Sequence, residues 1–196
     1  MRLLELNAEH SLRGGAERLI RAVYALHYGA HVTIFPKTII ALSDSKDRIH
    51  AAAGFRDFTE PFFSEHYLDT PIEEIIGRTA RRRIEREAIV EVSSLASRTP
   101  AISVQFLNKL VLYGEELGYE WAFFTATNRL EKLLRRMRLP LFCLGTACSS
   151  RVPNPEQWGT YYETDPRVLA FGAEQLLPFL MKQAAPARTQ EMCAHG

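Results

Sequence analysis

The chain has 196 residues, of which 46% are hydrophobic and 24% charged, enough to enclose the core of one globular domain. Its formal net charge of +1 argues against a general nucleic-acid binder, and no run of about 18 apolar residues could cross a bilayer. Polar residues interrupt the N-terminal stretch where a signal peptide needs an unbroken apolar core. We therefore expect a cytoplasmic protein without a transmembrane segment.

In the first half of the chain, apolar spacing predicts a helix over residues 15–28, which Gly29 ends. Two apolar runs, 38–44 and 48–56, predict a β-hairpin, and a loop rich in aromatic residues follows. Thr70 and Pro71 then provide an N-cap and a first helical residue for a helix that runs through residue 83.

The second half alternates strands and helices. Residues 88–96, 119–127 and 141–145 are expected to be strands. Thr99 and Pro100 predict the start of a helix over 101–118, and Asn128 is expected to cap a helix over 129–138. A long loop then leads to a final helix, "GAEQLLPFLMK".

This order predicts one α/β (α+β) domain, with a mixed central sheet that has helices on both faces. We expect the domain to span residues 1–184 and residues 185–196 to form a flexible tail. The three cysteines lack CxxC spacing and the six histidines are scattered, so neither a disulfide framework nor a metal site is expected. Cys148 fits a small buried thiol better than a nucleophile.

One carboxylate interrupts an apolar strand. Glu91 lies within "IVEVSSLAS", and burying an ionised carboxylate without a partner costs roughly several kcal/mol. Two explanations remain open: Glu91 has a functional role, or it pairs with a core arginine such as Arg56. Glu65 and His66 are second choices for acid/base chemistry.

Positive charge is concentrated in two segments. Residues 78–86 and residues 129–138 each hold five basic side chains against one glutamate. Such segments indicate either docking of an acidic partner or ordinary solvated helix faces. The docking hypothesis is assigned to Arg81, Arg82, Arg83, Arg135 and Arg136.

The order of elements resembles the GNAT acyltransferase architecture, in which a strand–helix–strand–helix core holds an acyl thioester. Within that class, the strand with Glu91 resembles the Glu-x-Ser-Arg strand of acyl-homoserine-lactone synthases. Glu91 and Ser93 match that pattern, whereas Ser94 stands where the arginine belongs. This departure puts the amine donor of those synthases in doubt.

The resemblance implies roles for several residues. Glu91 and Ser93 would be catalytic, with Glu91 binding the incoming ammonium group or accepting a proton from it. The acyl donor would be bound by Ser94, Arg98, Thr125 and Asn128. The phosphate-binding pattern Arg/Gln-x-x-Gly-x-Gly/Ala is replaced by "SRTPAIS", which lacks glycine and so lacks its usual approach to a pyrophosphate. Acyl-phosphopantetheine on a carrier protein is therefore expected beside acyl-CoA as co-substrate, with no tightly bound cofactor. The acceptor would be a small amine or amino acid.

Several segments in order also resemble the thermostable hemolysin family. The matching pieces are "YGAHVTIFPKTIIAL", "AAAGFR", "SEHYLDTPIE", "IVEVSSLAS", "FTATNRL" and "WGTYYETDPRVLAFG". The family name implies red-cell lysis, which leaves a membrane-active toxin as one alternative to the enzyme. A non-catalytic domain that binds an acylated carrier is the other alternative.

Overall fold

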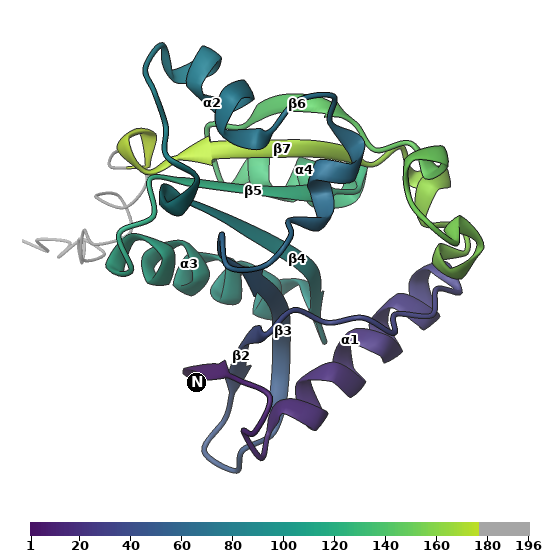
Figure 1. The fold of residues 1–196 in the computed structure, drawn as a ribbon. Helices are drawn as coiled ribbons and strands as arrows, with labels where there is room; N and C mark the ends of the chain where they lie inside the picture. The colour runs from purple at the N-terminus through teal and green to yellow at the C-terminus, as the bar shows by residue number, and fades with distance from the viewer. Residues whose placement is uncertain (177–196) are drawn as a thin grey trace, which may run out of the picture.

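The computed structural model describes residues 1–176. The strands are β1 (Arg2–Leu6), β2 (Thr38–Ser43), β3 (Ile49–Arg56), β4 (Ile89–Ser97), β5 (Trp121–Ala126), β6 (Phe142–Thr146) and β7 (Arg167–Gly172). The helices are α1 (Arg13–Tyr28), α2 (Ile72–Ala80), α3 (Pro100–Glu116) and α4 (Asn128–Arg136). Short 3₁₀ turns, among them η1 (Phe63–Tyr67), occupy the longer connections (Figure 1).

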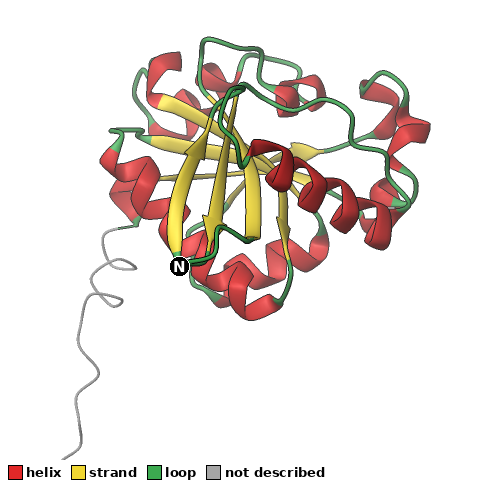
Figure 2. Cartoon of the chain, turned by 90° about the horizontal axis from the view of Figure 1, so that it is seen from below, coloured by secondary structure: helices red, strands yellow, loops and turns green. Residues whose placement is uncertain are grey.

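The seven strands form one sheet in the order β1-β2-β3-β4-β5-β7-β6. The central pair, β4 and β5, is parallel, and every other neighbouring pair in this sheet is antiparallel. Apolar clusters lie on both faces, with α1 and α2 over one face and α3 and α4 over the other (Figure 2). The predicted mixed α/β sheet with helices on both faces is confirmed.

Two strands escaped prediction. β1 and β7 lie outside the expected hairpin and core strands, yet β7 inserts between β5 and β6 and is buried over most of its length. Within the predicted final helix, residues 173–175 form a 3₁₀ turn, and its remainder from residue 177 lies outside the described residues. The expected domain end at residue 184 and the tail after it lie outside them as well.

Three differences between the predicted and observed helix ends have a clear local cause. Pro71 occupies the N-cap position of α2 instead of Thr70, and the Glu65 carboxylate accepts a hydrogen bond from the Ile72 N–H. Arg81 adopts a left-handed backbone, so α2 ends at Ala80. The predicted cap Asn128 is wrong because Thr127 is the N-cap of α4, and its hydroxyl accepts from the Leu130 N–H.

Other expectations have clear outcomes. Thr99 caps α3, with its side chain accepting from the Ile102 N–H and Pro100 as the first helical residue, as predicted. Cys148 is exposed, so its expected burial is wrong. Among residues 1–176, no helix is sufficiently long and apolar to cross a membrane.

Candidate active site

The parallel strands β4 and β5 separate at the centre of the sheet. They pair only from Ile89–Glu91 to Trp121–Phe123 and diverge beyond that point. Ser94 has a φ of +50°, and the register between β3 and β4 shifts beside it, so β4 contains a bulge. A bulge leaves one residue unpaired and disrupts the ladder locally, so backbone groups near Ser94 are not all used in pairing with β3.

A cavity of about 550 Å³ occupies this gap, a volume within the range of small-molecule sites. Ser93 and Thr125 line it from the sheet face covered by α1 and η1, whereas Val92, Leu95 and Phe124 line it from the face covered by α3 and α4. The cavity therefore passes between the strands and connects the two faces of the sheet.

The outer end of the cavity is electropositive. The helices α3 and α4 begin at Thr99 and Thr127, and both of these N-caps line the cavity. Arg98 and Arg129 line the same end, and Arg98 Nε donates to the Ile49 carbonyl at 3.1 Å. Helix N-termini and guanidinium groups both attract anions, so this mouth suits a phosphate group.

The interior of the cavity, between the sheet and α3 and α4, is apolar. Side chains from both helices and from β5 and β7 form its walls. They are Leu107, Leu110, Val111, Leu130, Leu133, Leu134, Leu139, Phe124 and Phe171. Such walls favour a hydrocarbon over a polar group, because unpaired polar groups are costly away from water.

The wall on the α1 side is aromatic and polar. Tyr24, Tyr28 and Tyr161 line the cavity, and Tyr24 and Tyr161 stack with ring centroids 6.2 Å apart. Burial raises the pKa of Tyr24 and of Tyr161, so both phenols are neutral at physiological pH. His27 lines the same wall. In the sequence these α1 residues are typical of a core-facing helix stripe, so their place in the cavity was not predicted.

Glu91 is fully buried and is not among the described residues that line the cavity. Its Oε2 accepts from the Phe63 N–H and its Oε1 from the Ser64 N–H, both at 2.7 Å, and Arg56 Nη1 lies 3.6 Å from Oε2. Burial raises the pKa of Glu91, opposed mainly by the Arg56 charge and then by the Ser64 side chain and the N–H groups of Ser64 and Phe63. This arrangement agrees with the second explanation, in which Arg56 is the partner.

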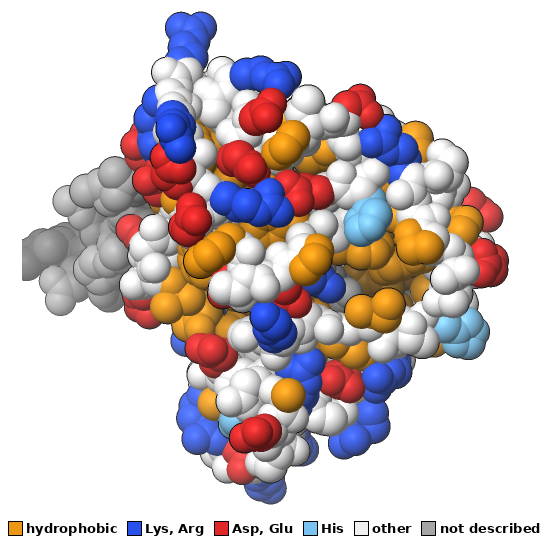
Figure 3. All heavy atoms as spheres, in the orientation of Figure 1, with side chains coloured by type: hydrophobic (Ala, Val, Ile, Leu, Met, Phe, Trp, Pro, Cys, Tyr) orange, Lys and Arg blue, Asp and Glu red, His pale blue; other side chains and the backbone are white. Residues whose placement is uncertain are grey.

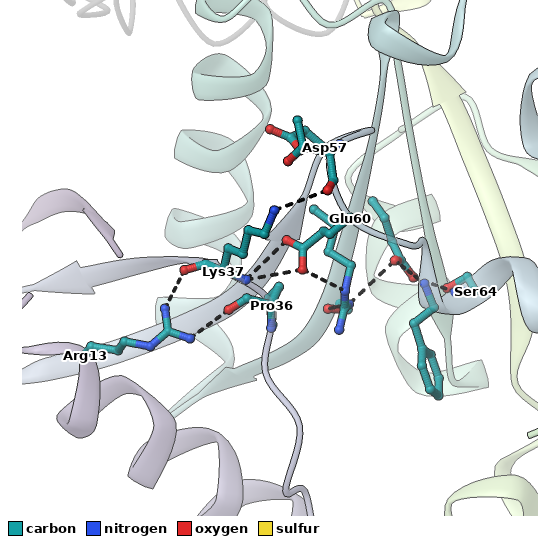
Figure 4. Close-up of polar contacts among 11 residues, drawn as sticks. Arg13, Pro36, Lys37, Asp57, Glu60 and Ser64 are labelled. Carbon is teal, nitrogen blue, oxygen red and sulfur yellow. Dashed lines mark hydrogen bonds and ion pairs between the residues drawn. The ribbon is translucent and has the colours of Figure 1, made fainter. Parts of the chain in front are cut away.

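The network continues on both sides of Arg56. Arg56 Nη1 donates to Ser93 Oγ at 2.8 Å, and its Nε lies 3.9 Å from Glu60. The Glu60 carboxylate accepts a hydrogen bond from the Lys37 N–H, and in Figure 4 Glu60 lies between Lys37 and Ser64. The buried carboxylate of Glu91 thus connects η1 to the strands β3 and β4.

The predicted donor-binding residues divide into two groups. Ser94, Arg98 and Thr125 all line the cavity, and Thr125 Oγ1 lies 2.8 Å from Ser64 Oγ. Asn128 is exposed and lies instead in a smaller adjoining hollow of about 500 Å³ on α4. This hollow is lined by Asn128, Arg129, Lys132, Arg136, Glu163 and Thr164.

The two basic segments also differ. Arg82 pairs with Glu120 at 2.6 Å and Arg83 with Glu85 at 2.8 Å, and basic and acidic side chains alternate over this region at the upper left of Figure 3. Glu120 precedes β5, so Arg82 lies at the opposite end of that strand from the electropositive mouth. On α4, Arg135 pairs with Glu131, whereas Arg136 lines the cavity.

The second-choice acid/base groups are occupied elsewhere. Glu65 forms ion pairs with Arg86 at 2.6 Å and also caps α2, and neither Glu65 nor His66 is among the described residues on the cavity. His66 Nδ1 lies 2.8 Å from the Phe63 carbonyl oxygen. These side chains shape the aromatic loop over the sheet.

Comparisons with known proteins agree with the geometry. No curated protein matches the chain by sequence. The AHL synthase LasI has a similar structure, with a TM-score of 0.59, 12% identity, and coverage of 91% of this chain and 94% of that chain. The CoA-dependent acyl-homoserine lactone synthase MesI has a TM-score of 0.57, 16% identity, and coverage of 95% and 97%. FeeM, an N-acyl amino acid synthase from uncultured soil microbes, has a TM-score of 0.58, 12% identity, and coverage of 89% and 98%.

These likenesses show that the fold is GNAT-like, as the sequence predicted. Membership of a family comes from the sequence itself. The family model described as thermostable hemolysin matches residues 6–176, which include every described strand from β2 onward and all four helices. The chain therefore belongs to the thermostable hemolysin family.

Proposed function

We propose that the protein is an acyltransferase that moves an acyl group from an acyl-CoA or acyl-carrier-protein thioester to an amine or amino acid. The cavity between β4 and β5 carries this proposal, because it joins an anion-attracting mouth, an apolar interior and a polar opposite wall. Similar folds in a CoA-dependent acyl-homoserine lactone synthase and an N-acyl amino acid synthase support the same reaction class. The donor acts as a co-substrate. We propose that the reaction takes place in the cytoplasm.

In this proposal the donor enters at the mouth. Its phosphate lies at the N-termini of α3 and α4, where Arg98 and Arg129 hold it. Its pantetheine arm then lies between β4 and Thr125 of β5 and reaches Ser94. The acyl chain then occupies the apolar interior. A single phosphate suits this mouth because Pro100 removes one backbone donor from the start of α3.

The reaction takes place where the strands separate. The acceptor nitrogen approaches along the tyrosine wall and attacks the thioester carbonyl carbon, and the tetrahedral oxyanion accepts from backbone N–H groups at the Ser94 bulge. Collapse breaks the C–S bond, forms the amide and releases the thiolate, which takes up the proton that the nitrogen loses. His27 is the histidine on this wall and relays that proton.

Glu91 and Ser93 act differently in this scheme. Ser93 lies on the cavity and, held by Arg56, contacts the acceptor. Glu91 is a positioning residue, because both of its oxygens accept from η1 and it holds Arg56 in place. The catalytic role first assigned to Glu91 stays a prediction, and its burial favours the positioning role.

Carrier docking is proposed for one face of α4. Arg129, Lys132 and Arg136 recur at spacings of three and four residues, are exposed, and show no ion pair within the described part of the chain. This basic stripe borders the mouth and matches the negative surface of an acidic carrier. Arg135 flanks it but is paired with Glu131. Docking at Arg81, Arg82 and Arg83 stays a prediction, with less support because that segment is remote from the mouth.

A thiol-release screen tests the proposed function. Purified protein is given acyl-CoA and acyl-carrier donors with a panel of amines and amino acids, and the amide product is identified by mass spectrometry. We expect free thiol to appear only with a matched acceptor. Stoichiometric donor binding without thiol release for any acceptor would instead indicate the non-catalytic carrier-binding alternative.

A pair of charge-reversal variants tests the docking face. Reversal of the two stripe residues that do not hold the phosphate, Lys132→Glu with Arg136→Glu, should raise KM for the carrier donor by tenfold or more, and each tenfold corresponds to about 1.4 kcal/mol. The matched control, Arg81→Glu with Arg83→Glu, should leave that KM unchanged. The opposite ranking of the two variants would move docking to the 78–86 segment.

A further inference from the structure

Gly114 lies on the cavity face of α3, at a position where the backbone conformation does not require glycine. Gly114 lies inside the helix, where glycine is unfavourable, and its φ is not among the positive values found at Gly29, Gly118 and Gly159. A Cβ atom at this position would have no heavy atom of the described residues within 4 Å, apart from its chain neighbours and the backbone of its own helix. Neither strain nor crowding therefore requires glycine at this position.

Gly114 marks the inner end of the cavity. The cavity face of α3 runs from Pro100 at the mouth through Leu107 and Val111 to Gly114, a distance of roughly 21 Å at the rise of an α-helix. Exposed Glu115 and the residues Glu120, Trp121 and Leu176 line the same end. Gly114 thus leaves open space beside α3 at the end of the cavity opposite the mouth.

The lengths divide this space between two parts of a thioester donor. Ser94 to Ser97 of β4 spans roughly 10 Å at the rise of a strand. This segment lies beside the mouth, and the pantetheine arm would follow it. About 11 Å of α3 then remains between the level of Ser94 and Gly114, because the helix returns over the sheet antiparallel to β4. The walls of this inner part are leucine, valine and phenylalanine.

We propose that the donor's acyl group is a medium-length hydrocarbon chain whose terminal carbons lie beside Gly114, and that the absence of a side chain there makes room for chains longer than a butanoyl group. This inference rests on the proposed function, whose site it describes in more detail. An acetyl group would leave the apolar interior empty, whereas each methylene buried there improves affinity by about fourfold. A side chain at position 114 would occupy the space of the terminal carbons and leave the rest of the site intact.

Binding measurements with donors of two lengths test this specificity role. Butanoyl-CoA and octanoyl-CoA are titrated by calorimetry into the full chain and into Gly114→Ala and Gly114→Phe, without acceptor. We expect Gly114→Phe to weaken octanoyl-CoA binding by at least about tenfold while butanoyl-CoA binding is unchanged. Gly114→Ala should give a smaller loss for octanoyl-CoA and a higher thermal midpoint, because alanine favours the helix.

Leu112→Phe is the matched control, since Leu112 is exposed on the outer side of α3 and away from the cavity. It should change neither affinity. Equal losses for both donors, or no loss with octanoyl-CoA in Gly114→Phe, would overturn the inference. Length-dependent binding that responds to position 114 without thiol release for any acceptor would overturn the proposed transfer reaction and leave the acyl site standing. Acyl transfer that proceeds while substitution at position 114 leaves the binding of both donors unchanged would overturn this inference and leave the proposed transfer reaction standing.

Discussion

At the scale of single residues, Glu91 shows how a buried charge can serve structure beside an active site. Its two oxygens accept from adjacent N–H groups of η1, and Arg56 balances its charge. Arg56 in turn fixes Ser93 on the cavity wall. The carboxylate therefore acts on the site through a guanidinium and a loop.

Replacing Glu91 distinguishes this role from proton transfer. Glu91→Gln should lower the free energy of unfolding by about 3 kcal/mol, because one η1 N–H faces an amide donor and Arg56 loses its counter-charge. Urea unfolding measures the loss. The folded variant should keep the pH profile of thiol release, with a raised KM for the acceptor. A variant as stable as the parent, but with kcat reduced a hundredfold or more and an altered pH profile, would show that Glu91 is a base.

The Glu65–Arg86 pair gives stability a defined pH dependence. The pKa of Glu65 is below its ordinary value: burial raises it, but hydrogen bonds and charge from Arg86, with the Ile72 N–H, more than offset that effect. Since the folded state favours the ionised form, the stabilisation is complete above the unfolded pKa of about 4.3 and is lost as pH falls through the lower folded value.

Urea midpoints of the parent and of Glu65→Gln, measured from pH 7 down to pH 3, check this dependence. The difference between the two proteins should be constant above about pH 5 and shrink below the ordinary pKa of glutamate. Glu85→Gln is the control, because the Glu85–Arg83 pair is exposed and should contribute little at any pH. A difference that grows on acidification would contradict the assignment.

At the scale of elements, the start of α4 depends on Thr127. Thr127→Ala should destabilise the protein by about 1 kcal/mol, because the Leu130 N–H loses its acceptor. Asn128→Ala should change stability by less than about 0.5 kcal/mol, since Asn128 is already helical and exposed. Urea denaturation of both variants makes the comparison, and a larger loss at Asn128 would restore the cap predicted from the sequence.

Gly54 of β3 allows Ser93 of β4 and Pro36 to pack closely against the strand. A Cβ at Gly54 would lie 2.5 Å from Ser93 Oγ and 2.8 Å from Pro36 Cγ. Gly54→Ala should therefore cost about 1–3 kcal/mol through overpacking. Adding Ser93→Ala should recover part of that loss, and a double-mutant cycle of unfolding free energies measures the coupling. Strict additivity of the two changes would show that the crowding is relieved elsewhere.

The elements show which features a sequence can specify. The central strands and α3 were predictable because their apolar patterns and the Thr99-Pro100 start are local signals. β7 was missed because its place between β5 and β6 depends on pairing with distant strands. The cap of α2 was missed for the same reason: it comes from Glu65 in the preceding loop.

Prediction of the site from the sequence has the same limit as prediction of the elements. Glu91 was identified because a carboxylate within an apolar strand is conspicuous, and Arg56 was named as one partner. The N–H donors of Phe63 and Ser64 depend on the path of a loop that no periodic pattern describes. The tyrosine wall joins Tyr24 to Tyr161, more than a hundred residues away, so only the folded chain brings it together.

At the scale of the whole molecule, the family name raises the question of direct lysis. The most apolar helix, α3, buries Phe106, Leu107 and Leu110 against the sheet, and α4 buries Leu134 in the same layer. Inserting these residues into a bilayer would require the core to open, at a cost comparable to unfolding the domain. The buried apolar faces of α3 and α4 are thus committed to the fold.

An enzyme that makes a surface-active acyl product could cause lysis indirectly. We therefore expect purified protein alone to release no haemoglobin from washed red cells over the time in which such a product would act. Release should begin only after donor and acceptor are both supplied, and should lag behind thiol release because the product must accumulate first. Haemoglobin absorbance and thiol release, followed in the same tube, measure that order. Reactions lacking the acceptor are the matched control, since they contain the same protein and donor. Prompt release by protein alone would mean that the described fold opens at the membrane and that lysis is direct.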